Sequence, residues 1–231
     1  MSMFSVVILT AAPPGQSAEG GGAFVKLDGR EILYKSVELF LNRENVKQIQ
    51  VVFAQDSLDE AKRKFGPHFG FSGVKVVGGG PKWVDQIHAV AEKISPDATH
   101  VIVHDAARPA VPYTDLEAIM DAAGKQPIIG LATPLRATLV ELDEGGSPLA
   151  YHSPANYMQL ATPQVFQRDR FLKFATTKAE PHPSEIKLLK GSPLNVRVGS
   201  GGDISLAKAM LSMMPKPKIK APNSPFEEAQ W

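Results

Sequence analysis

Short apolar runs that alternate with more polar stretches of about ten residues restrict the fold of this sequence more than any other feature. The apolar runs are rich in valine and isoleucine, as strands buried on both faces are. They predict strands at residues 4–11, 48–54, 73–79, 100–107 and 126–134. The stretches between them predict helices at residues 31–43, 57–66, 83–94 and 115–124. Because strands separated by helices form βαβ units, the pattern predicts an α/β fold with a parallel sheet covered by helices on both faces.

The alternation breaks after Arg136. Residues 137–153 read as two short strands around DEGGSP, which indicates a hairpin. We expect this hairpin to leave the domain as a β-arm of about residues 137–158. The segment QLATPQVFQRDRFLKFATTK then resumes the pattern, and LNVRVGSGGDISLAKAMLSMM predicts a last strand and helix. The expected organisation is one domain at residues 1–214, followed by a tail rich in proline and lysine at 215–231.

Composition excludes several classes of function. The 231 residues carry 25 Lys and Arg against 24 Asp and Glu, a net charge of +1 that gives no electrostatic basis for binding nucleic acid or a membrane. There is no cysteine, which excludes disulfides, thiolate metal sites and a cysteine nucleophile. No apolar run reaches the roughly 18 residues that a membrane-spanning helix needs. These features predict a cytoplasmic protein.

The first expected strand is followed by the glycine-rich stretch LTAAPPGQSAEGGGAFVKLDG at residues 9–29. Its position suits a loop that holds a phosphate group, yet no lysine or arginine lies between Leu9 and Lys26. The glycines do not fit the G-x-G-x-x-G pattern of dehydrogenases, and no G-K-[ST] of a Walker A loop is present. Taken alone, this stretch is better explained as a flexible loop without a ligand.

A second stretch, HDAARP at residues 104–109, is more informative. Ligands of open parallel sheets bind at the carboxyl ends of the strands, where this stretch is expected to lie. The oxygens of Asp105 could hold a divalent cation, and Arg108 could bind a phosphate in a forked geometry. The alternative is a salt bridge between Asp105 and Arg108 that only closes the end of the strand.

HDAARP after a buried strand resembles the 2-C-methyl-D-erythritol 4-phosphate cytidylyltransferase family and the related ribitol-phosphate cytidylyltransferases. The segments VVILTAA, FVKLDGREILYKSVELF, TPLRATL, ATPQVF and GGDISLAKAML follow in the order of the family. The resemblance implies a Rossmann-like nucleotidyltransferase core and a homodimer formed through the β-arm. It also implies CTP, Mg²⁺ and a sugar-alcohol phosphate as ligands, with transfer of CMP and release of pyrophosphate.

The resemblance further implies roles for individual residues. On the nucleotide side, the matching residues are Ala11, Ala12, Gly79, Gly80 and Asp85. On the acceptor side, the matching residues are Arg108, Arg136, Thr138, Thr162 and Arg197. The implied catalytic residues are Asp105, which would also hold the metal, Arg108 and Lys26.

Several contacts of the family to CTP have no counterpart in this chain. The opening loop lacks the family's arginine, and the family's catalytic lysine aligns with Gly22 rather than Lys26. Trp83 stands where an arginine is typical, and Gln86 replaces a serine. Lys26, Lys82 and Arg30 are the nearest cations that could substitute.

Three hypotheses follow from these matches and losses. The first is a cytidylyltransferase that works with an altered loop. The second is a catalytically impaired family member that binds a nucleotide or a sugar phosphate as a dimer. The third is an unrelated α/β protein, such as a dehydrogenase.

Overall fold

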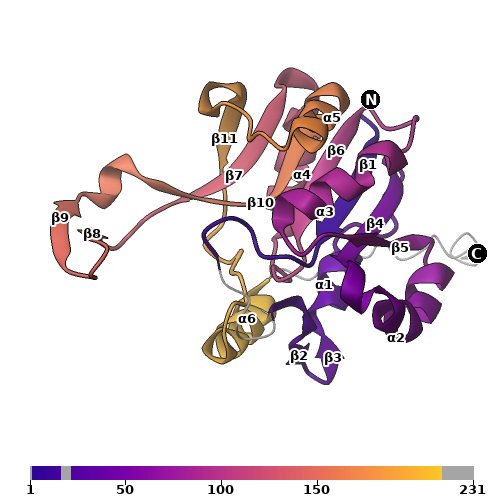
Figure 1. Ribbon diagram of the computed structural model, residues 1–231, viewed down its shortest axis with the longest axis horizontal. Coiled ribbons are helices and arrows are strands. Elements are labelled where there is room, and N and C mark those ends of the chain that lie inside the picture. The colour runs from indigo at the N-terminus through magenta and orange to yellow at the C-terminus, as the bar shows by residue number, and fades with distance from the viewer. Residues whose placement is uncertain (1, 17–21, 215–231) are drawn as a thin grey trace, which may run out of the picture.

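A seven-stranded sheet forms the centre of the protein (Figure 1). The computed structural model describes residues 2–16 and 22–214, so part of the opening loop and the expected tail lie outside the described residues. The strands of this sheet, in spatial order, are β11 (Ile186–Lys190), β7 (Ile128–Pro134), β10 (Met158–Gln167), β6 (His100–Asp105), β1 (Phe4–Leu9), β4 (Val46–Ala54) and β5 (Val74–Gly79). All neighbours pair in parallel except β10, which is antiparallel to both β6 and β7. The predicted α/β fold with a mostly parallel sheet is confirmed.

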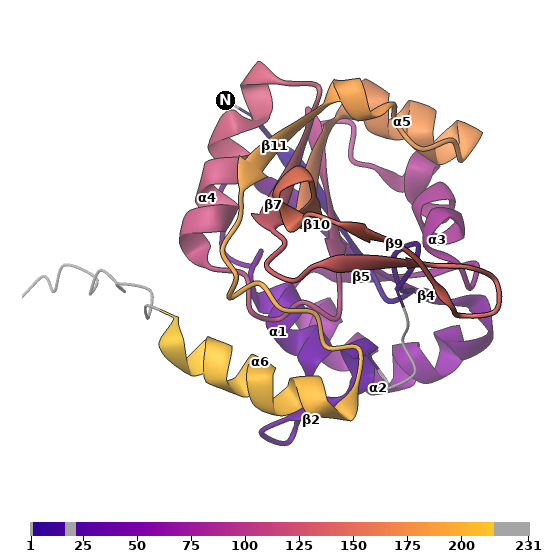
Figure 2. The same cartoon turned by 90° about the vertical axis from the view of Figure 1, so that its left-hand side faces the viewer.

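Helices cover both faces of the sheet (Figure 2). The helices are α1 (Ile32–Glu38), α2 (Leu58–Phe71), α3 (Trp83–Val90), α4 (Tyr113–Ala122), α5 (Arg168–Thr177) and α6 (Gly201–Met213). Short 3-10 helices lie at Gly22–Phe24, Gln55–Ser57, Ala91–Lys93, Ala123–Lys125, Pro154–Asn156 and Pro183–Glu185. Helices α1, α2 and α4 pack on one face, while α3 and α5 pack on the other. The expected alternation of strands and helices is therefore confirmed over the first 134 residues.

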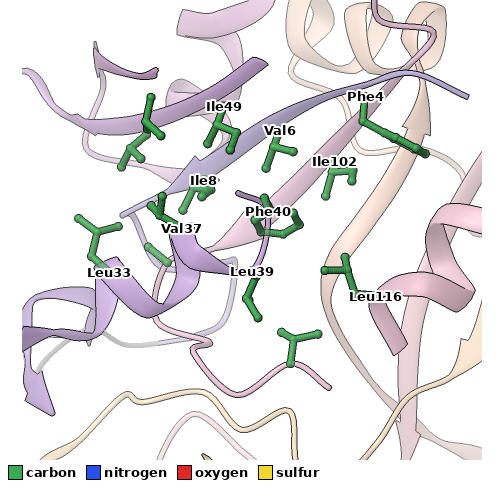
Figure 3. Close-up of a cluster of buried hydrophobic side chains, with 14 of the residues drawn as sticks. Phe4, Val6, Ile8, Leu33, Val37, Leu39, Phe40, Ile49, Ile102 and Leu116 are labelled. Atoms are coloured by element: carbon green, nitrogen blue, oxygen red, sulfur yellow. The ribbon is translucent and has the colours of Figure 1, made fainter. Parts of the chain in front are cut away.

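The central strand β1 shows why such a run must be buried on both sides. Phe4, Val6 and Ile8 point into the cluster formed with α1, α2 and α4 (Figure 3). Val7 and Leu9 point into the cluster formed with α3 and α5. Because each fully buried side chain of this size contributes about 1.5–3 kcal/mol, this one strand anchors both halves of the core.

A two-stranded hairpin made of β2 (Lys26–Leu27) and β3 (Arg30–Glu31) precedes α1. Asp28 and Gly29 form its turn, both with positive φ (50° and 85°), which is the combination that a type I′ turn requires. Leu27 packs with α6 in a small satellite cluster, and Lys208 of α6 contacts Asp28 at 2.6 Å. The hairpin therefore fixes Lys26 on an exposed strand rather than in a flexible loop.

The expected hairpin after Arg136 is present. It consists of β8 (Leu139–Leu142) and β9 (Pro148–His152), which pair with each other outside the main sheet. Asp143 stabilises the turn, because its Oδ1 accepts hydrogen bonds from the amides of Gly145 (2.9 Å) and Ser147 (2.8 Å). Figure 1 shows this arm extending well away from the sheet.

The predicted last strand in LNVRV was wrong. Residues 194–198 form an irregular connection, and the edge strand is β11 instead. Polar contacts of Asn195 replace the hydrogen bonds of a strand: its carbonyl accepts from Arg108 Nη1 (2.8 Å), and its side-chain amide donates to the carbonyl of Thr162 (2.8 Å). The connection is thus held against the ligand edge of the sheet.

Candidate active site

The carboxyl ends of four parallel strands meet at one edge of the sheet. Leu9 at the end of β1 lies opposite Asp105 of β6 on one side and Val52 of β4 on the other. Ala54 at the end of β4 lies opposite Gly79 of β5. This register brings together the opening loop, the glycine turn after β5 and the HDAARP stretch, as the sequence predicted.

Asp105 is the centre of a buried charge cluster. The residue is 1% exposed, and its Oδ2 lies 2.7 Å from Arg197 Nε and 3.8 Å from Arg108 Nε. Its Oδ1 accepts a hydrogen bond from the amide of Ala107 at 2.9 Å. The guanidinium groups of Arg108 and Arg197 therefore converge on the single carboxylate of Asp105.

Arg108 is held almost entirely inside the protein. It is 3% exposed, and its Nε has no hydrogen-bond partner among the described residues beyond the longer ion pair with Asp105. Burial lowers the pKa of Arg108, while the charge of Asp105 opposes that shift. A buried, incompletely satisfied guanidinium is a strong attractor for an anion.

A chain of hydrogen bonds fixes the shape of the HDAARP stretch. The amide of Asp105 donates to Thr162 Oγ1 at 2.9 Å, and Thr162 Oγ1 lies 3.3 Å from His104 Nδ1. His104 Nε2 lies 3.1 Å from the carbonyl of Arg108. Since a carbonyl only accepts, the imidazole carries its proton on Nε2, and Nδ1 accepts from the threonine hydroxyl.

Burial keeps this imidazole neutral. It lowers the pKa of His104 to about 3, and the nearby charge of Arg108 acts in the same direction. His104 therefore shapes the site and does not exchange protons near neutral pH.

A cavity of about 290 Å³ lies beside the charge cluster. The polar groups of its wall come from Arg108, Thr162, Gln164, Gln16 and the carboxyl group of Glu180. The rest of the wall is largely apolar and comes from Pro13, Pro14, Trp83, Leu160, Phe166, Phe174 and Ile186. Arg108 and Thr162 are two of the acceptor-side residues that the sequence predicted, and the structure brings them together.

A second depression of about 620 Å³ lies over the opening loop. Ala11 and Ala12 line it, and Trp83 lines both this depression and the first cavity. Among the described residues that line it, Lys82 is the one cation, and Lys26 is absent. Of the substitute cations considered from the sequence, Lys82 has the position that suits a triphosphate.

The glycine turn after β5 is closely packed against α3. A Cβ at Gly79 would lie 3.1 Å from Gln86 Cα, and a Cβ at Gly80 would lie 2.5 Å from Asp85 Cβ. Asp85 itself forms an ion pair with Lys178 at 2.7 Å, and this hydrogen bond lowers the pKa of Asp85. These glycines are required by packing, whatever ligand they also approach.

The arm residues lie apart from this cluster. Arg136 and Thr138 are exposed between β7 and β8, and in the part of the chain that the structure describes no hydrogen bond or ion pair joins their side chains to the buried cluster. Arg197 in contrast lies directly on Asp105. Sequence reasoning missed Asn195, which holds Arg108. It noted Gln86 only as a replaced serine, without the contact that its side chain makes with the opening loop.

The described residues do not form a resident metal site. Within residues 2–16 and 22–214, no group of three or more His, Asp or Glu side chains is placed to hold a metal ion. Both oxygens of Asp105 already accept hydrogen bonds, from Ala107 and Arg197. Because each carboxylate oxygen has a second lone pair, the metal role expected of Asp105 stays a prediction.

An α/β sheet with a glycine-rich loop and a cationic cluster at its carboxyl edge defines a nucleotidyltransferase-like protein. The family model described as IspD, 2-C-methyl-D-erythritol 4-phosphate cytidylyltransferase, matches residues 5–213. The chain therefore belongs to this family, as the resemblance indicated.

Individual relatives agree with this assignment. The chain is 28% identical over 220 residues to the 2-C-methyl-D-erythritol 4-phosphate cytidylyltransferase of Symbiobacterium thermophilum, covering 89% of this chain and 92% of that protein. It is 26% identical to the bifunctional enzyme IspD/IspF of Desulforudis audaxviator, where it covers 89% of its own length but only 56% of the relative. The solved 4-diphosphocytidyl-2C-methyl-D-erythritol synthase of Anaerococcus prevotii has a TM-score of 0.72 at 18% identity, covering 91% of this chain and 99% of that one, and so shares the fold. No helix among the described residues is long and apolar enough to cross a membrane.

Proposed function

We propose that this protein is a cytidylyltransferase that transfers CMP from CTP to a sugar-alcohol phosphate, such as 2-C-methyl-D-erythritol 4-phosphate, and releases pyrophosphate. The observation that carries the proposal is the cluster of Arg108 and Arg197 around Asp105 at the end of β6. Membership of the family supports the reaction type.

The cluster suits an acceptor phosphate. Arg108 is 3% exposed with an Nε that lacks a hydrogen-bond partner among the described residues, and its charge attracts an anion strongly because water screens it little. Asp105 orients Arg197 through Nε, and Asn195 orients Arg108 through Nη1. Arginine pre-ordered in this way binds a phosphate at little further cost in side-chain entropy.

The reaction needs little beyond this positioning. A phosphate oxygen of the acceptor attacks the α-phosphorus of CTP and forms a new P–O bond. The bond from the α-phosphorus to the oxygen that bridges it to the β-phosphate breaks, and the electron pair leaves with pyrophosphate. Because the attacking oxygen is already anionic, the side chains act by alignment and by charge neutralisation.

Magnesium enters this scheme with the nucleotide. Mg²⁺ commonly binds through substrate phosphates and few protein ligands, which agrees with the lack of a resident site in the described residues. We treat the Mg–CTP complex as the substrate and assign no step to a metal held by Asp105.

The depression over the opening loop, where the nucleotide would bind, favours a second function. One lysine, Lys82, lines the depression over the opening loop, and Trp83 fills a position where the family typically has an arginine. A protein with such a loop could bind CTP or a sugar phosphate without turning it over. That is the catalytically impaired member of the family considered from the sequence.

We also propose that two copies associate through the arm. Its strands and the segment after them expose large apolar side chains: Val140, Leu142, Leu149, Tyr151 and Tyr157. Exposed apolar side chains gathered on one projecting hairpin are typical of an interface. Light scattering should give a molar mass twice that of one chain. The double variant Tyr151→Lys, Leu149→Lys should give the mass of a single chain.

The cytoplasmic location stays a prediction.

Pyrophosphate release tests the proposed reaction. Each of the four nucleoside triphosphates is mixed with magnesium, 2-C-methyl-D-erythritol 4-phosphate and the protein, with Asp105→Ala as the control. We expect release from CTP alone, reduced at least tenfold in the variant. Calorimetric binding of CTP without release from any triphosphate would favour the binding protein instead.

A further inference from the structure

Gln86 is buried in the first turns of α3 with its side chain directed at the opening loop. It is 1% exposed and lines the depression over that loop. Its Oε1 accepts hydrogen bonds from the amides of Thr10 at 3.0 Å and Ala11 at 3.1 Å. Its Nε2 lies 3.4 Å from Thr10 Oγ1. One side chain thus binds the loop at three points where the loop leaves β1.

The two amides differ in how much they depend on this contact. The amide of Thr10 also reaches the carbonyl of Val52 at 3.2 Å, so it is shared with the sheet. The amide of Ala11 has Gln86 as its acceptor and no other among the described residues. Backbone amides at the carboxyl end of the first strand are the donors that a nucleotide would be expected to meet in such a fold.

We infer that Gln86 occupies the Ala11 amide and competes with the nucleotide for it. The inference rests on the proposed function, because it assumes that the nucleotide binds over this loop. A ligand oxygen can accept from the Ala11 amide only if the glutamine oxygen moves away. The free protein therefore has this donor satisfied from within, and part of the binding energy of CTP is lost in displacing it.

The surroundings leave Gln86 little freedom to move by itself. Gly79 of β5 lies against the Gln86 backbone so closely that a Cβ there would be 3.1 Å from Gln86 Cα. Helix α3 is thereby fixed against the sheet. The distance from the Cα of residue 86 to the loop is then one that a glutamine side chain spans. A serine at this position is two bonds shorter in reach and would leave the Ala11 amide open to a ligand.

Calorimetry with CTP and magnesium tests the inference on the full chain. We expect Gln86→Ser to bind CTP about 3- to 10-fold more tightly, the worth of one hydrogen bond no longer displaced. Gln86→Glu should bind CTP more weakly than the wild type, since a carboxylate holds the amide more firmly and repels the triphosphate. Gln50→Ser is the matched control: Gln50 is equally buried in β4, and the change should leave CTP affinity as it was.

Amide hydrogen exchange supplies a readout that a purely structural role would not change. In Gln86→Ser, the Ala11 amide should exchange quickly without nucleotide and slowly with CTP, whereas in the wild type it should be slow in both states. Gln86→Ala serves as a second variant should the serine variant not fold.

Failure of this inference can be told from failure of the proposed function. If the wild type releases pyrophosphate but folded Gln86→Ser binds CTP no more tightly, the inference on Gln86 is overturned alone. If neither the wild type nor any variant binds CTP, the inference on Gln86 and the proposed function are both overturned.

Discussion

Arg197 and Asp105 are 92 positions apart in the chain, yet the Nε of the arginine lies 2.7 Å from Oδ2 of the aspartate. Both side chains are largely buried, and Arg108 approaches the same carboxylate oxygen at 3.8 Å. This contact brings the connection before α6 against the end of β6 and so assembles the charge cluster. The carboxylate of Asp105 therefore offsets the positive charge of both arginines.

Replacing Asp105 with asparagine should destabilise the fold as well as the reaction. Without the negative charge, Arg108 and Arg197 would repel each other in a poorly screened environment. Breaking a buried ion pair in this way costs about 3 kcal/mol or more of unfolding free energy. Urea unfolding measures this loss of unfolding free energy. The control is Asp121→Asn on the exposed face of α4, whose unfolding free energy should stay within about 0.5 kcal/mol of the wild type. A loss below about 1 kcal/mol for Asp105→Asn would contradict the central place of this carboxylate.

Lysine substitutions should identify the cation that serves the triphosphate. Lys82 lines the depression over the opening loop, whereas Lys26 lies on the exposed β2 strand. We therefore expect Lys82→Ala to weaken CTP binding by about tenfold and Lys26→Ala to change it by less than about threefold, as judged by calorimetry. The reverse order would support the catalytic role that the family resemblance implied for Lys26.

The buried His104 should make the protein less stable in mild acid. Its folded pKa of about 3 lies below the ordinary value of 6.5, so between these values the unfolded chain binds a proton that the folded protein does not. Stability therefore falls as the pH is lowered from about 6.5 toward 3. From pH 7 to pH 5.5 this group should remove about 1 kcal/mol of unfolding free energy.

Urea unfolding at the two pH values tests this, using His104→Asn. The variant should lose about 1 kcal/mol less than the wild type between pH 7 and pH 5.5. An identical pH dependence for His104→Asn and the wild type would show that His104 is not held neutral by burial.

A methyl group at Gly80 should disturb the turn before α3. The added Cβ would lie 2.5 Å from Asp85 Cβ, so the helix or the turn must shift, at a cost of about 1–3 kcal/mol. Gly70 offers a matched control, because it lies within α2 and an added Cβ there meets nothing within 4 Å. Thermal unfolding should show a lower melting temperature for Gly80→Ala and an equal or higher one for Gly70→Ala. A Gly80→Ala variant as stable as the wild type would mean that the turn is not tightly packed.

The sequence was sufficient for the fold wherever strand and helix periodicity was strong. The runs that became β1, β4, β5, β6 and β7 were predicted to within a few residues. In the central strands β1 and β6, burial on both faces demands continuous apolar residues. The edge strand β11 was missed, since IKLLK has lysines at both sides of a short apolar pair and pairs on one side only. The apolar LNVRV was taken for a strand in its place, although its hydrogen bonds go to Arg108 and Thr162.

The site was predicted only in part, because some of its contacts join elements that are distant in the sequence. The family resemblance named Asp105, Arg108, Thr162 and Arg197, and the structure brings these four residues together. The role of Gln86 depends on how closely α3 approaches the end of β1, which no local pattern records. Whether Arg136 and Thr138 reach a site depends on the arm, which extends away from the sheet of its own chain.

Transfer of label from CTP to the acceptor tests the central claim most directly. CTP labelled at its α-phosphate is incubated with magnesium, 2-C-methyl-D-erythritol 4-phosphate and either the wild type or Arg197→Met, and the products are separated by charge. We predict that the wild type moves the label into a cytidine diphosphate conjugate of the acceptor, and that the variant does so at least tenfold more slowly. Label that stays in CTP while calorimetry shows CTP bound would contradict the claim, and would identify the protein as one that binds nucleotide without transferring it.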